Sequence, residues 1–445
     1  MFLVPSASTQ MKSSHFLPLA DERIDSRTKG MPAELPVMPL GEIGRQGWNL
    51  LRRDLTTPLA VLNRDAIEEN SRWIAAVMAQ YRVSLCPHGK TTMAPQLFRK
   101  QLDDGCWGIT LSTQHHVQVA RHYGVARIFL ANQILDPGFL SYIARSQIDD
   151  PDFDFYFLVD SLEGAALLEE IAAAHPGHRP FQVLIELGSP FARTGCRTEA
   201  AARLIAERLA GMQHAALLVG IEGFEGSIRG ADRTEIERRI TEFLVFMTQT
   251  AEAFAAAGLF RGKEILLTAG GSAFFDLVAK ALSRPAFDSP SRVVLRSGCY
   301  ISHDAGMYER EIARALERSP ELATLDAAPR QALTVWATVQ SRPEPGLAFL
   351  NAGRRDVSYD AHLPRPLRHA SDATALTVWD LPDGYEITML NDQHAYLKCP
   401  EDSPLRPGDL VELGISHPCT TFDKWDVLCV IDEHFNVVDA VKTFF

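Results

Sequence analysis

The sequence has no apolar run that approaches the ~18 residues of a membrane-spanning helix. Its opening, Met1-Phe2-Leu3-Val4-Pro5, is too short for the apolar core of a signal peptide. Cysteine is scarce, and the seven cysteines are odd in number, scattered and mostly inside apolar stretches. This pattern is typical of reduced thiols rather than of a disulfide framework. We therefore expect a cytoplasmic protein that does not enter a membrane.

Positive charge is also in deficit. The chain carries 44 Lys and Arg against 56 Asp and Glu, a net charge of −12. Such a chain presents no general field that would hold a nucleic acid backbone or an anionic membrane surface. A small anion can still bind, because a few backbone N–H groups and one arginine suffice to hold it. The charge balance argues against nucleic acid as a partner and leaves small ligands open.

The remaining composition is that of an enzyme-sized globular chain. The 445 residues are 46% hydrophobic and 22% charged, which argues against a disordered, collagen-like or coiled-coil protein. At roughly 150 residues per domain the length suggests two or three domains, although an α/β barrel can use about 250 residues as one domain.

From Leu59 onward, apolar runs of strand length alternate with amphipathic stretches of helix length. The first run, Leu59–Asn63, precedes a predicted helix over about 65–80. Eight further runs follow, each with a helix-like stretch behind it, and they begin near Val83, Trp107, Arg127, Phe153, Phe181, Leu217, Ile265 and Val293. Because each βα unit needs a right-handed crossover, eight in succession predict a (β/α)8 TIM barrel of the α/β class. An open doubly wound sheet is the alternative.

The pattern changes at Ser319–Pro329. Beyond this segment, short alternating runs are separated by turn residues, which is typical of an antiparallel sheet. The runs cover 333–340, 347–351, 375–380, 385–390, 409–413 and 427–432. We therefore predict an N-terminal extension over 1–45, part of it loose, a barrel over 46–320 and a C-terminal antiparallel β-domain over 321–445.

Ligands of such barrels bind where the strands end. After the first barrel strand, Lys90 lies in a loop bounded by Gly89 and Pro95, and Arg193 stands between glycines after the strand that begins near Phe181. Two glycine-rich turns follow the last two strands. They comprise Gly270, Gly271 and Ser272 after the seventh strand, and Gly298, Cys299 and Tyr300 after the eighth. Their N–H groups and hydroxyls occur where such barrels commonly hold phosphate.

A phosphate site, an inward lysine and an arginine are the parts that pyridoxal phosphate needs: an anion cradle, an amine for a Schiff base and a cation beside the phenolic oxygen. An aldolase that forms a lysine Schiff base without a cofactor would share the lysine and the phosphate site. Spacing alone leaves both readings open.

His417 and Cys419 form a second candidate site near the C-terminus. On an extended segment residues i and i+2 point to one face, so an imidazole and a thiolate could reach one metal ion. This ligand pair favours Zn²⁺. Two protein ligands leave positions open for water or substrate, as in a catalytic site.

The segment Pro87-His88-Gly89-Lys90-Thr91 resembles a cofactor-lysine motif. The motif that it resembles is found in the D-serine dehydratase and D-threonine aldolase family, whose members are fold-type III pyridoxal phosphate enzymes related to bacterial alanine racemase. The resemblance runs from about Thr57 to Lys442. Further matches, in the family's order, are Gly220–Gly226, Asn351–Arg355, Asp392–His394 and His417–Thr421.

The resemblance implies a role for each candidate residue. Lys90 would bind pyridoxal 5'-phosphate as a Schiff base and take the α-proton of a D-amino acid, while Arg193 would contact the phenolic oxygen. The two glycine-rich turns would hold the phosphate. His417 and Cys419 would bind Zn²⁺ or another divalent metal, which ligates the substrate and activates its β-hydroxyl. A homodimer is implied as well.

The same residues permit two reactions of a small D-3-hydroxyamino acid. β-Elimination of water from D-serine or D-threonine gives a 2-oxo acid and ammonia, whereas Cα–Cβ cleavage gives glycine and an aldehyde. In the family, cysteine at the second metal position is typical of the dehydratases. We therefore expect a D-amino-acid ammonia-lyase, with a D-threonine-type aldolase as the alternative. A non-catalytic cofactor carrier with a single barrel is a third possibility, which the additional β-domain argues against.

Overall fold

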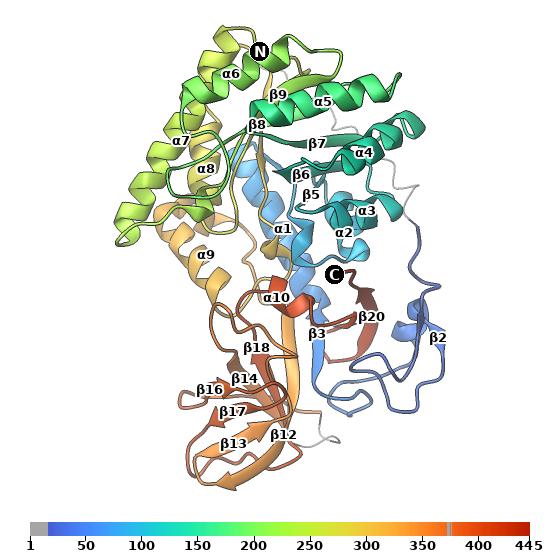
Figure 1. Cartoon of the computed structure of the whole chain (residues 1–445). Coiled ribbons are helices and arrows are strands. Elements are labelled where there is room, and N and C mark those ends of the chain that lie inside the picture. Colours follow the sequence, from blue (N-terminus) through green and yellow to red (C-terminus); the bar gives the residue numbers. More distant parts are fainter. Residues whose placement is uncertain (1–16, 372–373, 375) are drawn as a thin grey trace. The chain divides into compact units, whose positions relative to one another are not determined.

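The computed structural model describes residues 17–371, 374 and 376–445 (Figure 1). The chain folds into two compact units that are discontinuous in sequence. The first contains residues 78–90 and 98–298, and the second contains residues 18–77, 91–97 and 299–445. Helices α1 (Arg64–Tyr81) and α2 (Pro95–Asp103) contribute residues to both units.

The first unit is built on eight parallel strands in the order β4-β11-β10-β9-β8-β7-β6-β5. Their bounds are β4 Ser84–Leu85, β5 Ile109–Leu111, β6 Arg127–Gln133, β7 Asp154–Val159, β8 Phe181–Leu187, β9 Ala216–Gly223, β10 Ile265–Thr268 and β11 Ser291–Leu295. Hydrogen bonds from Trp107 N to Leu85 O (2.7 Å) and from Thr110 N to Pro87 O (2.9 Å) join the two ends of this order. The predicted barrel is confirmed, and the open sheet is wrong.

Helices flank the barrel strands (Figure 1). They are α3 Gln114–His122, α4 Pro137–Asp149, α5 Leu162–Ala174, α6 Glu199–Ala210, α7 Arg233–Ala256 and α8 Phe275–Leu282. Five of them begin with a side-chain cap, in which Thr113, Asp136, Ser161, Thr198 or Asp232 accepts a hydrogen bond from an amide of the first turn. Such a cap stabilises a helix by about 1 kcal/mol. A polar capping residue in the sequence therefore marks where each of these five helices begins.

Inward-facing side chains fill the barrel. A buried layer is formed by Cys86, Phe129, Tyr156, Leu158, Leu184, Val219, Leu266 and Val294, with Trp107 and Leu217 packed against it. Each comes from a barrel strand or directly follows one, as expected for a packed (β/α)8 interior. The barrel therefore has a solid apolar centre, and polar chemistry is confined to its two ends.

The second unit is an antiparallel assembly around the long strand β12 (Leu333–Glu344). Its main sheet has the order β15-β14-β18-β12-β13-β17-β16, and β3 pairs with β12 and β19, which pairs with β20. The other strands are β1 Arg23–Ile24, β2 Met38–Pro39, β3 Leu59–Asn63, β13 Leu347–Leu350, β14 Arg365–Ala370, β15 Trp379–Asp380, β16 Glu386–Leu390, β17 Ala395–Lys398, β18 Leu410–Gly414, β19 Val427–Ile431 and β20 Val437–Lys442. Its helices include α9 (Met307–Arg318) and α10 (Cys419–Phe422).

These units differ from the predicted continuous regions. Strand β3, which the sequence analysis placed in the barrel region, pairs antiparallel with β12, Val61 opposite Thr334, and belongs to the second unit. Helix α9 belongs there too. The N-terminal segment is not loose from Pro18 onward, because Leu40 and Ile43 are buried and β1 pairs with β2. Residues 1–16 lie outside the described residues.

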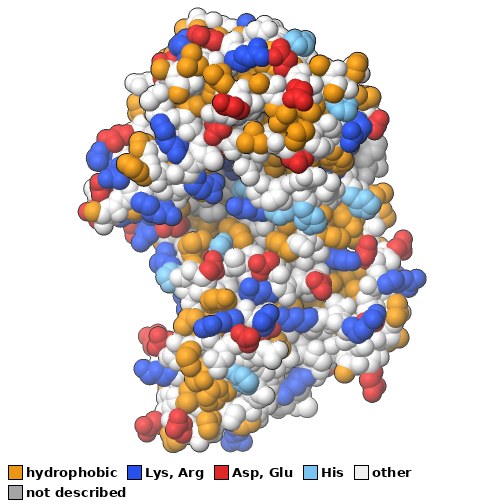
Figure 2. All heavy atoms as spheres, viewed as in Figure 1, with side chains coloured by type: hydrophobic (Ala, Val, Ile, Leu, Met, Phe, Trp, Pro, Cys, Tyr) orange, Lys and Arg blue, Asp and Glu red, His pale blue; other side chains and the backbone are white. Residues whose placement is uncertain are grey.

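Charge is mixed on the visible surface. Figure 2 shows Lys and Arg side chains interspersed with Asp and Glu over the face that it presents. This distribution agrees with the absence of a single-sign field expected from composition. Among the described residues, no helix is long and apolar enough to cross a membrane.

Gly220 provides a test of the barrel packing. It lies opposite Leu266 in the β9–β10 pairing, and a Cβ on Gly220 would be 2.1 Å from the carbonyl oxygen of Leu266. Gly220→Ala must therefore displace a barrel strand, and we expect it to lower the free energy of unfolding by about 1–3 kcal/mol or more. Gly211→Ala is the matched control, because its nearest neighbour would lie 3.5 Å away. Equal urea midpoints for the two variants would contradict this packing.

Candidate active site

Lys90 lies on a short 3-10 turn, Gly89–Thr91, that follows β4. The turn needs glycine at position 89, because a Cβ there would lie 2.8 Å from both Ile109 Cγ2 and Phe98 Cε1. Lys90 itself is exposed and makes no ion pair with any residue that the structure describes. The predicted position of Lys90, in a loop after the first barrel strand, agrees with this geometry.

His88 precedes this turn. Burial and the positive charges of Lys90 and Arg296 hold the pKa of His88 well below its ordinary value. Its Nδ1 is buried and has no hydrogen-bond partner in the described part of the chain. His88 is therefore a neutral imidazole beside the lysine turn, and it adds no charge that would compete with Lys90.

A buried ion pair lies inside the barrel at the carboxyl end of its strands. Arg296, directly after β11, pairs with Glu222 near the end of β9, and its Nη2 donates to Gly223 O at 3.0 Å. Both side chains are buried. Burial raises the pKa of Glu222 to about 7, although Arg296 opposes the shift. The sequence analysis did not predict this pair: Glu222 lies in the matched segment Gly220–Gly226, but nothing local to it indicates Arg296 as its partner.

The carboxylate of Glu225 occupies two of the amides that were predicted to hold phosphate. Gly270 N donates to Glu225 Oε2 at 3.0 Å, and Gly271 N donates to Oε1 at 2.9 Å. Glu225 follows β9 and is fully buried. The turn is thus an anion-binding nest, and in this structure its anion is a side chain of the protein.

The first unit contains further predicted cofactor residues, among them Ser272 and Arg193. Ser297 Oγ donates to Gly271 O at 2.8 Å, which ties the two glycine-rich turns together within the first unit. Ser272 is half-buried. Arg193 is exposed, makes no ion pair with a described residue, and its guanidinium lies 4.7 Å from the ring centre of Phe224.

In the second unit, one buried carboxylate positions His417. Asp304 Oδ1 accepts hydrogen bonds from the amides of Gly306, Tyr308 and Glu309 at the start of α9, and its Oδ2 accepts one from His417 N at 3.1 Å. His417 has a φ of +89° and leads through Pro418 into α10. The segment is therefore a turn, and the predicted extended geometry is wrong, because the chain must reverse here to begin the helix.

The turn nevertheless brings the two predicted metal residues together. A hydrogen bond with Cys419 raises the pKa of His417 to about 9, with Asp360, 2.5 Å from its Nδ1, also contributing and burial opposing. Cys419 lies 4.0 Å from Cys299 Sγ and 3.5 Å from Thr91 Oγ1. Hydrogen bonding from Cys299 and His417 holds the pKa of Cys419 well below its ordinary value, although burial opposes this. Each side chain thus favours the charged form of the other.

Known proteins share this architecture. Residues 62–281 match the "Alanine racemase, N-terminal domain" family, and residues 332–431 match the "Putative serine dehydratase domain" family. A D-threonine aldolase from Arthrobacter sp is 25% identical over 390 residues, which cover 84% of this chain and 89% of that protein. The chain belongs to the family of D-serine dehydratases and D-threonine aldolases, with the alanine racemase fold.

Solved structures agree on the fold. D-threonine aldolase from Filomicrobium marinum superposes with a TM-score of 0.71 at 20% identity, covering 89% of this chain and 96% of that one. D-threo-3-hydroxyaspartate dehydratase from Delftia sp. HT23 gives 0.68 at 22%, covering 89% and 99%. Two variants of a D-threo-3-hydroxyaspartate dehydratase have also been solved, one with alanine in place of a histidine and one, in a metal-free form, with alanine in place of the cysteine two positions further along.

The residues of the first unit fit the family's cofactor. Lys90 and Arg193 are cations without an acidic partner among the described residues, and the Gly270–Gly271 nest already binds one carboxylate. Because Glu225 accepts from the amides of Gly270 and Gly271, these two amides of the predicted phosphate cradle are already paired. Cys299 also presents its thiol to Cys419, a contact that its predicted cradle role did not anticipate.

The donors of the second unit fit a metal as a pair. Cys419 is favoured as a thiolate, the form that binds metal, whereas the proton that His417 holds must leave before its imidazole can bind the same ion. In the described ranges, no group of three or more His, Cys, Asp and Glu side chains is arranged to hold a metal ion. Two protein ligands leave the remaining positions to water or substrate, as in a catalytic site.

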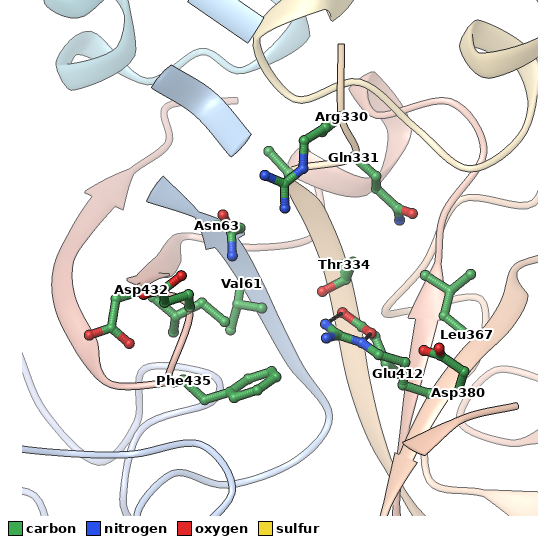
Figure 3. A pocket seen from close by; sticks show the side chains of 14 residues that line it. Val61, Asn63, Arg330, Gln331, Thr334, Leu367, Asp380, Glu412, Asp432 and Phe435 are labelled. Atoms are coloured by element: carbon green, nitrogen blue, oxygen red, sulfur yellow. Dashed lines mark hydrogen bonds and ion pairs between the residues drawn. The ribbon is translucent and has the colours of Figure 1, made fainter. Parts of the chain in front are cut away.

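A cavity of about 450 Å³ in the second unit is separate from these residues (Figure 3). It lies over β3, β12, β14 and β18, and its side chains include the ion pair of Arg368 with Glu412. None of the predicted cofactor or metal residues lines it. Its size alone therefore does not make it the reaction site.

Glu222 predicts a pH dependence of stability. Its pKa is about 7 in the folded protein and ordinarily 4.5, so the folded state holds this proton more tightly. The resulting stabilisation is complete below about pH 4.5 and is lost as pH rises through about 7. We expect a loss on the order of 3 kcal/mol in wild type and a flatter profile in Glu222→Gln, measured by urea unfolding between pH 5 and 8.

The control for this experiment is Glu199→Gln, which removes a carboxylate from a partly exposed pair with Arg203 on α6. Its profile should run parallel to wild type. Parallel profiles of stability against pH for Glu222→Gln and wild type would show that Glu222 is not the titrating group.

Proposed function

We propose that this chain is a pyridoxal phosphate-dependent and metal-dependent lyase of small D-3-hydroxyamino acids, which eliminates water to give a 2-oxo acid and ammonia. The observation that carries the proposal is the His417–Cys419 pair, whose spacing equals that of the histidine and cysteine replaced in the two D-threo-3-hydroxyaspartate dehydratase variants. The metal-free state of that cysteine variant supports a metal-ligand role for Cys419.

In the first unit, Lys90 would bind the cofactor covalently and take the α-proton. Pyridoxal phosphate supplies an electron sink that makes the α-proton of a bound amino acid acidic. Lys90 suits the role of base because it is exposed and has no acidic partner among the described residues, and because His88 beside it stays neutral. Arg193 would place a positive charge at the cofactor's phenolic oxygen.

In the second unit, His417 and Cys419 would hold a divalent cation, with Zn²⁺ favoured. Such a cation supplies a Lewis acid for the leaving hydroxyl. Asp304 fixes the backbone of His417, and Asp360 fixes its Nδ1, so the imidazole enters the site already oriented. Thr91, which contacts Cys419 Sγ, is the residue that follows Lys90 in the chain.

Aldol cleavage to glycine and an aldehyde is the second candidate. The 25% identity to D-threonine aldolase supports it. Both reactions use the same D-3-hydroxyamino acids and differ in which bond of the substrate breaks, so products decide between them.

We expect the purified chain, supplied with pyridoxal phosphate and Zn²⁺, to convert D-threonine to 2-oxobutanoate and ammonia. L-threonine is the control for stereochemistry, and D-serine and D-threo-3-hydroxyaspartate complete the panel. Addition of a chelator should abolish turnover, and Zn²⁺ should restore it. Glycine and acetaldehyde as the sole products would establish the aldolase, and full activity in chelator would exclude the metal role.

Lys90→Ala tests the cofactor assignment. Borohydride reduction of the wild-type chain with pyridoxal phosphate should leave a cofactor adduct on the peptide that contains Lys90, detected by mass spectrometry. Lys90→Ala should lack this adduct and lose at least about 10³-fold in kcat, since it removes both the attachment and the base. Lys100→Ala, which removes an amine paired with Asp104, is the control. A wild-type level of adduct in Lys90→Ala would contradict the assignment.

A further inference from the structure

A second cavity lies at the opposite end of the barrel, within the first unit. Its volume is about 530 Å³, in the range of small-molecule sites. Arg127 and Asp154 begin β6 and β7, and Gln182, Leu217 and Leu266 are each second in their strands, so the cavity marks the amino ends. Lys90, Arg193 and the Gly270–Gly271 nest follow carboxyl ends and do not line it.

Positive charge exceeds negative charge around this cavity. Arg127 donates to Asp154 through Nε (3.1 Å) and Nη2 (2.9 Å), and Arg179 lies 3.8 Å from the same carboxylate. Arg261 and Lys263 also line the cavity, and neither forms an ion pair with a described residue. The only other lining acid, Glu264, pairs with Arg292, which is not a lining residue. Within a chain of net charge −12, this is a local cationic site.

Two polar atoms of lining residues lack partners in the described part of the chain. Gln147 is 3% exposed, and its Oε1 is buried without a hydrogen bond. Arg179 Nε is likewise buried without an acceptor. A buried unsatisfied group costs about 1–3 kcal/mol. Two lining residues thus carry one unused acceptor and one unused donor, and the lining as a whole carries surplus positive charge.

Part of the cavity lining is apolar. The rings of Trp107 and Tyr156 lie 5.0 Å apart with their planes tilted by 46°, and Leu217, Val219 and Leu266 also line the cavity. Burial raises the pKa of Tyr156 to about 12, so its hydroxyl stays neutral. A planar ring suits this lining better than a hydrated inorganic ion, because it can stack on one aromatic ring, contact the other in a tilted arrangement and pack against the aliphatic side chains.

We propose that the amino-terminal end of the barrel binds a small planar anion, a ring carboxylate that also carries a hydroxyl or N–H donor. The anionic group accepts from Arg179 Nε and faces Arg261 and Lys263. The ring lies on Trp107 and Tyr156, and the donor satisfies Gln147 Oε1. This site is separate from the residues that carry the proposed function, and it stands whether or not that function is correct.

Three probes separate these contributions by isothermal titration calorimetry of the full chain loaded with pyridoxal phosphate. They are 4-hydroxybenzoate, benzoate, which lacks the donor, and 4-hydroxybenzamide, which lacks the charge. We expect 4-hydroxybenzoate to bind at least about tenfold more tightly than either. Equal affinity of 4-hydroxybenzoate and 4-hydroxybenzamide, or no binding of any probe at millimolar concentration, would overturn the proposal.

Substitutions of lining residues test whether the probe binds in this cavity. Arg261→Gln combined with Lys263→Gln changes exposed side chains, so the fold should persist, and affinity for 4-hydroxybenzoate should fall at least about tenfold. Gln147→Leu should remove the preference for 4-hydroxybenzoate over benzoate and leave benzoate affinity unchanged. Arg284→Gln, an exposed charge of the same unit outside the lining, is the control. Binding that is unchanged in both lining variants belongs elsewhere on the chain and overturns the assignment.

Discussion

Parallel pairing from β4 through to β5 brings the carboxyl ends of eight strands to one rim of the barrel. The apolar layer between the rims leaves polar groups only at the two ends. Lys90, Arg193 and Glu225 all follow carboxyl ends, so their loops converge although they are far apart in sequence. The amino ends form the other rim, where Arg127 and Asp154 begin their strands. One hydrogen-bonding pattern thus produces two chemically distinct ends.

A comparable constraint acts in the second unit through a single carboxylate. Asp304 is 1% exposed and accepts four backbone N–H groups, three at the start of α9 and one from His417. A negative charge at a helix start is favourable, because it satisfies free amides and opposes the helix dipole. The same charge holds the backbone of His417 at positive φ, which few non-glycine residues adopt. Helix capping and orientation of the candidate metal ligand are therefore one interaction.

The barrel strands could be predicted from sequence because each is an apolar run, and because a polar helix cap follows five of the eight. All eight predicted starts lie within two residues of the observed strands. Strand β14 escaped prediction, because Arg365, Arg368 and His369 obscure its alternation, and Arg368 is stabilised there by Glu412, which is distant in sequence. The sequence likewise did not predict that β3 belongs to the second unit, because its partner β12 lies some 270 residues further along the chain. Local sequence patterns predict individual strands and helices, whereas the pairing of strands depends on residues that are far apart in the sequence.

The residues of the candidate site likewise fall into those that local sequence predicts and those that it does not. Lys90 and the His417–Cys419 pair were predicted as site residues from local motifs, whereas no role was predicted for Glu222, Glu225 or Asp304, although the first two lie in the matched segment Gly220–Gly226. These three buried carboxylates share a physical role, because each neutralises or occupies a positive group: the Arg296 guanidinium, the Gly270–Gly271 amides and the start of α9. A buried charge is costly unless it is paired. Because the buried positive groups are matched internally, the exposed cations Lys90 and Arg193 carry no structural ion pair and remain available for a ligand.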